Sequence, residues 1–94
     1  MTTADFLIKG ASLPDGKKAD ISISNGVIAS VGSGFKGEAH TVIDGKDCVV
    51  LPGLVDLHTH LREPGKEDSE TIETGSRAGA KGGYTALVAM PNTS

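Results

Sequence analysis

Residues 52–65, PGLVDLHTHLREPG, decide the fold, because they place two histidines two residues apart at the end of an apolar run. Side chains alternate faces along a β-strand, so His58 and His60 point to one side of the strand. Their Cβ atoms are expected roughly 6.7 Å apart, from where two imidazoles can lean toward one ion. Arg62 lies two positions after His60, so the same alternation directs it to the side of the histidines. Its guanidinium can form a bidentate pair with a carboxylate. The stretch therefore predicts a strand that ends in a metal- and anion-binding site.

A helix is predicted to follow this strand. Acidic residues crowd positions 67–73, where negative charge suits the amide-rich helix N-terminus, and Asp68 or Ser69 can cap it. Ile72, Gly75, Ser76 and Gly79 recur at helical spacing, so this face is mostly small and the helix can lie close on a sheet. The Gly82-Gly83 pair is expected to end the helix.

A second strand is expected over residues 84–90, a nearly unbroken apolar run typical of a parallel strand covered on both faces. Strand, helix and strand form a βαβ unit, which is right-handed by the general rule. In parallel α/β folds, functional residues lie at the carboxyl ends of the strands. The first strand ends with the two histidines and Arg62, and Asn92 follows the second strand. We therefore expect these four side chains to converge on one rim.

The composition is that of a soluble globular protein, with 37% hydrophobic residues, 22% charged residues and a formal net charge of −3 at pH 7. This mildly acidic composition lacks the excess of positive charge that is typical of proteins that bind nucleic acid or an anionic membrane surface. Residues 1–9 lack a basic region followed by a long apolar stretch, and no run approaches membrane-spanning length. A cytoplasmic location is therefore expected.

The length conflicts with an enzyme built on parallel βαβ units. The 94 residues of the chain fall far below the roughly 250 that are typical of an enzyme barrel. The sequence also stops at Ser94 soon after an apolar run, with no tapering polar tail. These features indicate an interrupted chain.

The first fifty residues are expected to form short strands separated by turns. The predicted strands cover residues 6–9, 19–24, 27–31, 40–44 and 48–51. Asn25-Gly26 tolerates the positive φ angles of a two-residue hairpin. Because five short strands with few large side chains bury little, we expect strands outside this chain to complete the unit. The lone cysteine, Cys48, has apolar neighbours and is predicted to be a buried thiol.

The polar residues also have plainer interpretations. An isolated His-x-His pair is usually incidental, but here it ends a strand and precedes Arg62. His40 has no partner at a ligating spacing and is expected to be an ordinary surface histidine. Asp56 shares the face of the two histidines and can either orient an imidazole or bond the backbone. Glu63 and the carboxylates of residues 67–73 are expected to form a solvated face that complements the helix dipole.

Several segments resemble one known family. They are GLVDLHTHLREPG at 53–65, ETIETG at 70–75, GGYT at 82–85 and MPNT at 90–93. Together they resemble the N-terminal part of bacterial dihydroorotases of the amidohydrolase superfamily, continuously from about residue 47 and more loosely before it. The resemblance implies that residues 1–52 are the N-terminal part of a small β-sandwich domain. It also implies that residues 53–94 start a metal-dependent (β/α)8 TIM barrel with its strand 1, helix 1 and strand 2.

The resemblance implies a zinc-dependent hydrolase that interconverts dihydroorotate and N-carbamoyl-aspartate in pyrimidine biosynthesis. By position, His58 and His60 match two ligands of the more buried of two zinc ions. Arg62 and Asn92 match residues that bind the substrate carboxylate. The family's remaining ligands and its general acid or base lie on later strands, so a chain that ends at Ser94 is expected to be inactive alone.

Other classes of protein remain open. Cyclic amidases of the allantoinase or hydantoinase type share the His-x-His pair, although allantoinases usually have Asn where this chain has Arg62, and hydantoinases usually lack the LREPG run. A non-catalytic scaffolding subunit with an amidohydrolase fold is the other alternative, but such a subunit has no need of the histidines and Arg62. The expected partner is a small-molecule substrate. A homo-oligomer or a carbamoyltransferase partner is left open.

Overall fold

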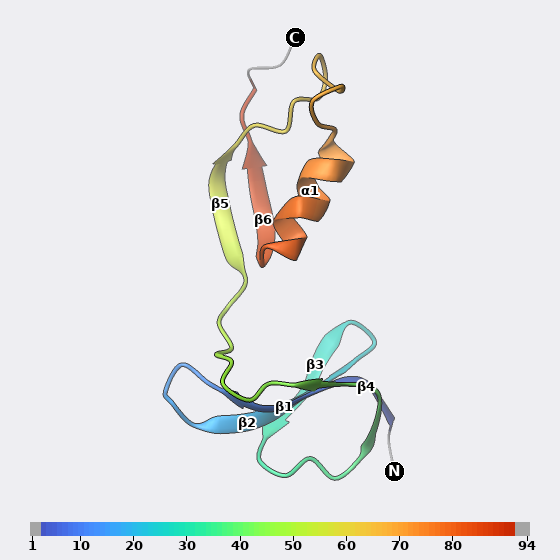
Figure 1. Ribbon diagram of the computed structural model, residues 1–94, viewed down its shortest axis with the longest axis vertical. Helices are drawn as coiled ribbons and strands as arrows, with labels where there is room; N and C mark the ends of the chain where they lie inside the picture. The colour runs from blue at the N-terminus through green and yellow to red at the C-terminus, as the bar shows by residue number, and fades with distance from the viewer. Residues whose placement is uncertain (1–2, 92–94) are drawn as a thin grey trace. The chain divides into compact units, whose positions relative to one another are not determined.

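The computed structural model describes residues 3–91, and the chain divides into two compact units, Met1–Leu51 and Pro52–Ser94 (Figure 1). Four strands form the first unit, and two strands with a helix form the second. Residues 3–91 therefore make a sheet-rich α/β structure with a single helix. No helix within this range is long and apolar enough to cross a membrane.

A four-stranded mixed sheet forms the first unit. Its strands are β1 (Thr3–Ser12), β2 (Lys18–Ser24), β3 (Val27–Gly32) and β4 (Glu38–Asp44). They lie in the order β3-β2-β1-β4, with β2 antiparallel to both β1 and β3, and β4 parallel to β1. The first four predicted strands are confirmed within these longer elements.

The β2–β3 hairpin turns at Asn25-Gly26, as the sequence predicts. The φ angles of Asn25 and Gly26 are 53° and 76°, and positive values at both positions are typical of a type I′ turn. The backbone N–H of Asn25 also donates to a carboxylate oxygen of Asp5 at 2.9 Å. The turn is therefore tied to β1 as well as to its own two strands.

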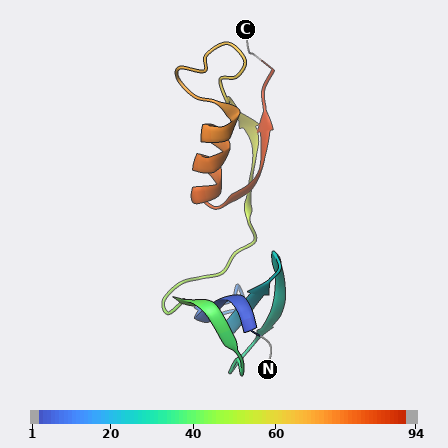
Figure 2. The ribbon, with the colours of Figure 1, turned by 90° about the vertical axis from the view of Figure 1, so that its right-hand side faces the viewer.

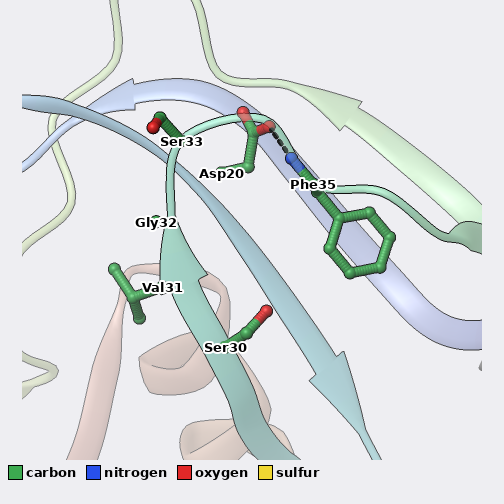
Figure 3. A pocket seen from close by; sticks show the side chains of 6 residues that line it. All are labelled: Asp20, Ser30, Val31, Gly32, Ser33 and Phe35. Atoms are coloured by element: carbon green, nitrogen blue, oxygen red, sulfur yellow. Dashed lines mark hydrogen bonds between the residues drawn. The ribbon is translucent and has the colours of Figure 1, made fainter.

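Asp20 on β2 links two irregular parts of the first unit. Its Oδ1 accepts from the backbone N–H of Gly10 at 3.0 Å, where the β1–β2 pairing shifts register. Its Oδ2 accepts from the backbone N–H of Phe35, in the β3–β4 connection, also at 3.0 Å (Figure 3). The bonds from Phe35 and Gly10 lower the pKa of the Asp20 carboxyl below its ordinary value. The small hollow beside Asp20, about 160 Å³, is lined by residues 30–33 and Phe35. Because both carboxylate oxygens of Asp20 are used by the backbone, we assign this residue a structural role.

The prediction of a fifth strand at residues 48–51 is wrong. Asp47 adopts a φ of 65°, and the N–H of Cys48 donates to the carbonyl of Gly45, so a turn precedes this segment. The segment then makes a single parallel bridge to β1, between Ser12 and Val49. Cys48 is exposed, so the prediction of a buried thiol is also wrong. Apolar neighbours in sequence did not bury it, because within residues 3–91 no second layer covers this segment.

The second unit contains β5 (Leu54–Thr59), α1 (Ile72–Lys81) and β6 (Tyr84–Ala89). β5 and β6 pair in parallel, and α1 lies along one face of the pair (Figures 1 and 2). The small helical face predicted from the sequence is confirmed. Gly75 is buried, where a Cβ would approach Leu61 Cδ2 to 2.8 Å, and a Cβ at Gly79 would approach Leu87 Cδ1 to 3.1 Å.

The helix begins later than the sequence predicts. Thr71 is the N-cap in place of Asp68 or Ser69, because its side chain accepts from the N–H of Thr74 while the Thr74 hydroxyl accepts from the N–H of Thr71. Ser69 instead donates its N–H to the carbonyl of Lys66, within a turn. The predicted helix end is confirmed, since Gly82 is the C-cap and the chain leaves the helix there.

Two threonine hydroxyls join the paired strands where their register is irregular. Thr85 Oγ1 donates to the Leu54 carbonyl at 3.3 Å, and Thr59 Oγ1 donates to the Val88 carbonyl at 3.0 Å. The Thr85 side chain lies so close to Gly53 that a Cβ at Gly53 would overlap it. Gly53 therefore permits the close approach of the two strands at their start.

Candidate metal and substrate site

Two imidazoles meet at the carboxyl end of β5. His58 lies in the strand and His60 follows it, with Thr59 between them directed toward β6. The Nε2 atoms of the two histidines are 3.2 Å apart. The ring centroids are 5.0 Å apart, and the ring planes meet at 63°. The alternation of side-chain direction along a strand thus brings the two Nε2 atoms close together on one side.

This distance fits a shared zinc ion. Two nitrogens, each 2.0–2.1 Å from one zinc ion and at a tetrahedral angle, lie about 3.3 Å apart. The observed 3.2 Å between the Nε2 atoms of His58 and His60 therefore suits two ligands of one ion. Catalytic zinc sites use about three protein ligands. The part of the chain that the structure describes has no group of three or more His, Cys, Asp or Glu side chains that could hold a metal. Two histidines alone are therefore fewer than the protein ligands that a catalytic zinc site uses.

Asp56 bonds the backbone, which was one of its two open interpretations. Its Oδ1 accepts from the N–H of His58 at 3.0 Å. The β5–β6 register is irregular between Asp56 and Thr59. The carboxylate thus satisfies a backbone N–H where the regular ladder is interrupted, next to a histidine of the pair.

Arg62 lies in the loop after β5, and its side chain is exposed. Its φ angle is 63°, which is left-handed backbone that an arginine rarely adopts. Its carbonyl accepts from the N–H of Lys66 at 3.0 Å, so the loop turns directly after it. Asn92, the other residue expected on this rim, lies outside the described residues.

Glu63 has a contact that the sequence did not reveal. It was expected to belong to a solvated face, but it is half-buried, and its Oε1 accepts from the backbone N–H of Ile72 at 2.8 Å. Ile72 is the first residue of α1. The two partners are nine positions apart in the sequence. They lie in a loop and at a helix start, so no strand or helix periodicity of the sequence indicates this bond.

Of the carboxylates expected on a solvated face, Glu70 is half-buried, and its Oε1 would lie 2.8 Å from a Cβ at Gly75, whereas Glu67, Asp68 and Glu73 are exposed. Glu73 pairs with Arg77 at 2.9 Å across one helical turn, and both side chains are exposed. Glu67 accepts from the N–H of Gly65 within the loop. His40 is exposed on β4, in the other unit. None of these contacts adds a ligand to the histidine pair.

Residues 3–91 thus form an α/β structure with a parallel strand pair and two imidazoles that meet at the end of one strand. A family model described as Dihydro-orotase-like matches residues 47–94, and the chain belongs to this family.

Curated relatives named Dihydroorotase match along nearly the whole chain. The protein from Streptomyces coelicolor is 53% identical over 87 residues, which are 93% of this chain and 20% of the relative. The protein from Leifsonia xyli subsp. xyli is 50% identical over 94 residues, covering 100% of this chain and 22% of its own length. The Bacillus subtilis protein is 49% identical over 92 residues, 94% of this chain and 22% of the relative. The chain thus spans about a fifth of the length of these relatives.

Proposed function

We propose that this chain forms part of a longer zinc-dependent dihydroorotase, which interconverts dihydroorotate and N-carbamoyl-aspartate in pyrimidine biosynthesis. The observation that carries the proposal is the pair of Nε2 atoms 3.2 Å apart at the end of β5, in a chain of the dihydroorotase-like family. The names of the curated relatives support the choice of substrate.

In this proposal, His58 and His60 bind one zinc ion through their Nε2 atoms. The chemistry that a bound zinc ion supplies is Lewis-acid activation of water and of the amide carbonyl. The chain's own contribution is to present both nitrogens from one strand, with the Asp56 bond fixing the backbone of His58. Further ligands and the group that transfers the proton come from outside the described residues.

Arg62 and Asn92 bind the carboxylate of the substrate in this proposal. A guanidinium matches a carboxylate with two parallel hydrogen bonds, which fixes both the position and the orientation of the ring. The exposure of the Arg62 side chain and its place two residues after His60 support this role. The amide of Asn92 would add a donor to the same carboxylate.

We further propose that residues 1–52 belong to a small β-sandwich domain and that residues 53–94 form the first βαβ unit of a (β/α)8 barrel. An apolar groove of about 390 Å³ beside α1 and β6, and large apolar side chains exposed on β5 and β6, support elements that cover this unit in the longer protein. These exposed side chains are Leu54, Val55, Leu57, Tyr84 and Val88.

The test is an assay of the longer enzyme that contains these residues. We expect it to hydrolyse dihydroorotate in preference to allantoin and hydantoin, to lose activity after chelation, and to regain it with zinc. Preference for allantoin or hydantoin would assign the chain to another cyclic amidase. No turnover of any cyclic amide by a folded, zinc-loaded protein would instead indicate a scaffolding subunit.

A further inference from the structure

The loop that carries Arg62 is fixed to α1 by the residues on either side of it. Leu61 lies against Gly75, as shown by the 2.8 Å that would separate a Cβ at Gly75 from Leu61 Cδ2. Glu63 Oε1 accepts from the N–H of Ile72 at 2.8 Å. Leu61 and Glu63 are both half-buried, while Arg62 between them is exposed. Arg62 is thus the exposed residue between two anchored neighbours.

The backbone of Arg62 requires such anchoring. Left-handed backbone brings the Cβ of an L-residue close to the neighbouring carbonyl, and a side chain such as arginine offers no compensating local bond. Residues in this region persist where surrounding contacts impose the conformation. The φ of 63° at Arg62 lies between the Leu61 contact and the Glu63 hydrogen bond. These two side-chain contacts act together with the backbone bond from the Lys66 N–H to the Arg62 carbonyl to impose it.

We propose that Glu63 is a positioning residue, which holds Arg62 in the left-handed conformation that presents its guanidinium to the substrate carboxylate. This inference rests on the proposed function, in which Arg62 binds that carboxylate. Glu63 acts through the N–H of Ile72, and its negative charge also suits the N-terminus of α1. A residue that only capped the helix would affect stability without a selective effect on substrate binding.

The contact itself is tested by amide exchange at Ile72 in the longer enzyme. Glu63→Ala removes the acceptor, and Glu63→Asp keeps the charge but shortens the side chain by one methylene. Glu63→Gln keeps an oxygen at the same reach. We expect exchange at Ile72 to rise about tenfold in the Ala and Asp variants and to stay within about twofold in the Gln variant. Asp68→Ala, which removes an exposed carboxylate of the same loop, is the matched control.

The consequence is tested by kinetics with dihydroorotate. We expect Glu63→Ala and Glu63→Asp to raise KM about tenfold with kcat within about twofold, and to leave the zinc content unchanged. In an Arg62→Ala background, Glu63→Ala should add less than about twofold to KM, because its effect acts through Arg62.

The outcomes separate this inference from the proposed function. Wild-type KM in both the Ala and Asp variants would overturn the positioning role, as would a loss of zinc or an equal loss of kcat. An undiminished effect in the Arg62→Ala background would also overturn it. Failure of the unmodified enzyme to convert dihydroorotate would instead refute the proposed function, before any Glu63 variant is compared.

Discussion

Replacing Arg62 by asparagine in the longer enzyme is expected to weaken the recognition of a carboxylated substrate. Asparagine is one of the few residues other than glycine that tolerates left-handed backbone. The substitution therefore removes the guanidinium while the φ of 63° at this position is kept. Any loss can then be assigned to the side chain.

The magnitude follows from the bond that is lost. A hydrogen bond to a charged group contributes about 1.5–3 kcal/mol, or roughly one to two decades in kcat/KM. Because the Arg62 side chain is exposed in the described structure, its water must be removed when substrate binds. We therefore expect the lower end of this range, about tenfold.

The assay compares kcat/KM for dihydroorotate with that for the same cyclic amide without its carboxylate. Arg62→Asn should reduce the first about tenfold and leave the second within about twofold. Arg77→Asn is the matched control, because Arg77 lies on α1 and pairs with Glu73 in solvent. Equal losses on both substrates would show that Arg62 has a structural role, and the reasoning would be refuted.

Three further predictions concern stability and completeness. Asp20→Asn should cost about 1 kcal/mol near neutral pH. The pKa of the Asp20 carboxyl is lowered in the folded state. The difference in free energy of unfolding between wild type and Asp20→Asn should therefore be full above the ordinary pKa of the carboxyl and shrink as the pH falls through the lowered value. Unfolding midpoints measured from about pH 3 to 6 check this, and a constant difference would contradict it. Gly53→Ala should destabilise the protein by about 1–3 kcal/mol, because its Cβ would overlap Thr85. Gly32→Ala is the control, because the space around its Cβ position is open, and it should cause no such loss. Equal unfolding midpoints for the two variants would exclude the close approach of Gly53 and Thr85. The 94-residue chain made alone should show no dihydroorotate turnover and should self-associate, which sedimentation and activity assays test; an active monomer would contradict the prediction.

The sequence predicted features that depend on local patterning. The Asn25-Gly26 turn, the helix end at Gly82 and the small helical face with Gly75 and Gly79 each follow from backbone freedom or residue size. The same alternation that places two histidines on one side of a strand gives the 3.2 Å approach of their Nε2 atoms.

Two of the features that the sequence did not predict depend on contacts beyond the local pattern, and the third depends on a local helix cap. Cys48 was expected to be buried because its neighbours are apolar, yet burial requires a covering layer, and Cys48 is exposed. The helix start was assigned to Asp68 or Ser69, but the reciprocal bonds of Thr71 with Thr74 begin the helix later. The Glu63 bond to the backbone of Ile72 spans a loop, so no periodicity could reveal it.

The central claim is that His58 and His60 hold one zinc ion. The most direct test is the number of zinc ions bound per chain. Three proteins should be purified with zinc: the longer enzyme, its His58→Ala variant and a His40→Ala control. Bound zinc and dihydroorotate turnover should then be measured for each. Loss of one ligand leaves the proposed site of the longer enzyme with an incomplete ligand set, so His58→Ala should lose about one zinc ion per chain and nearly all turnover. His40 is exposed on β4, and its removal should change neither quantity. Unchanged zinc content in the folded His58→Ala protein would contradict the account.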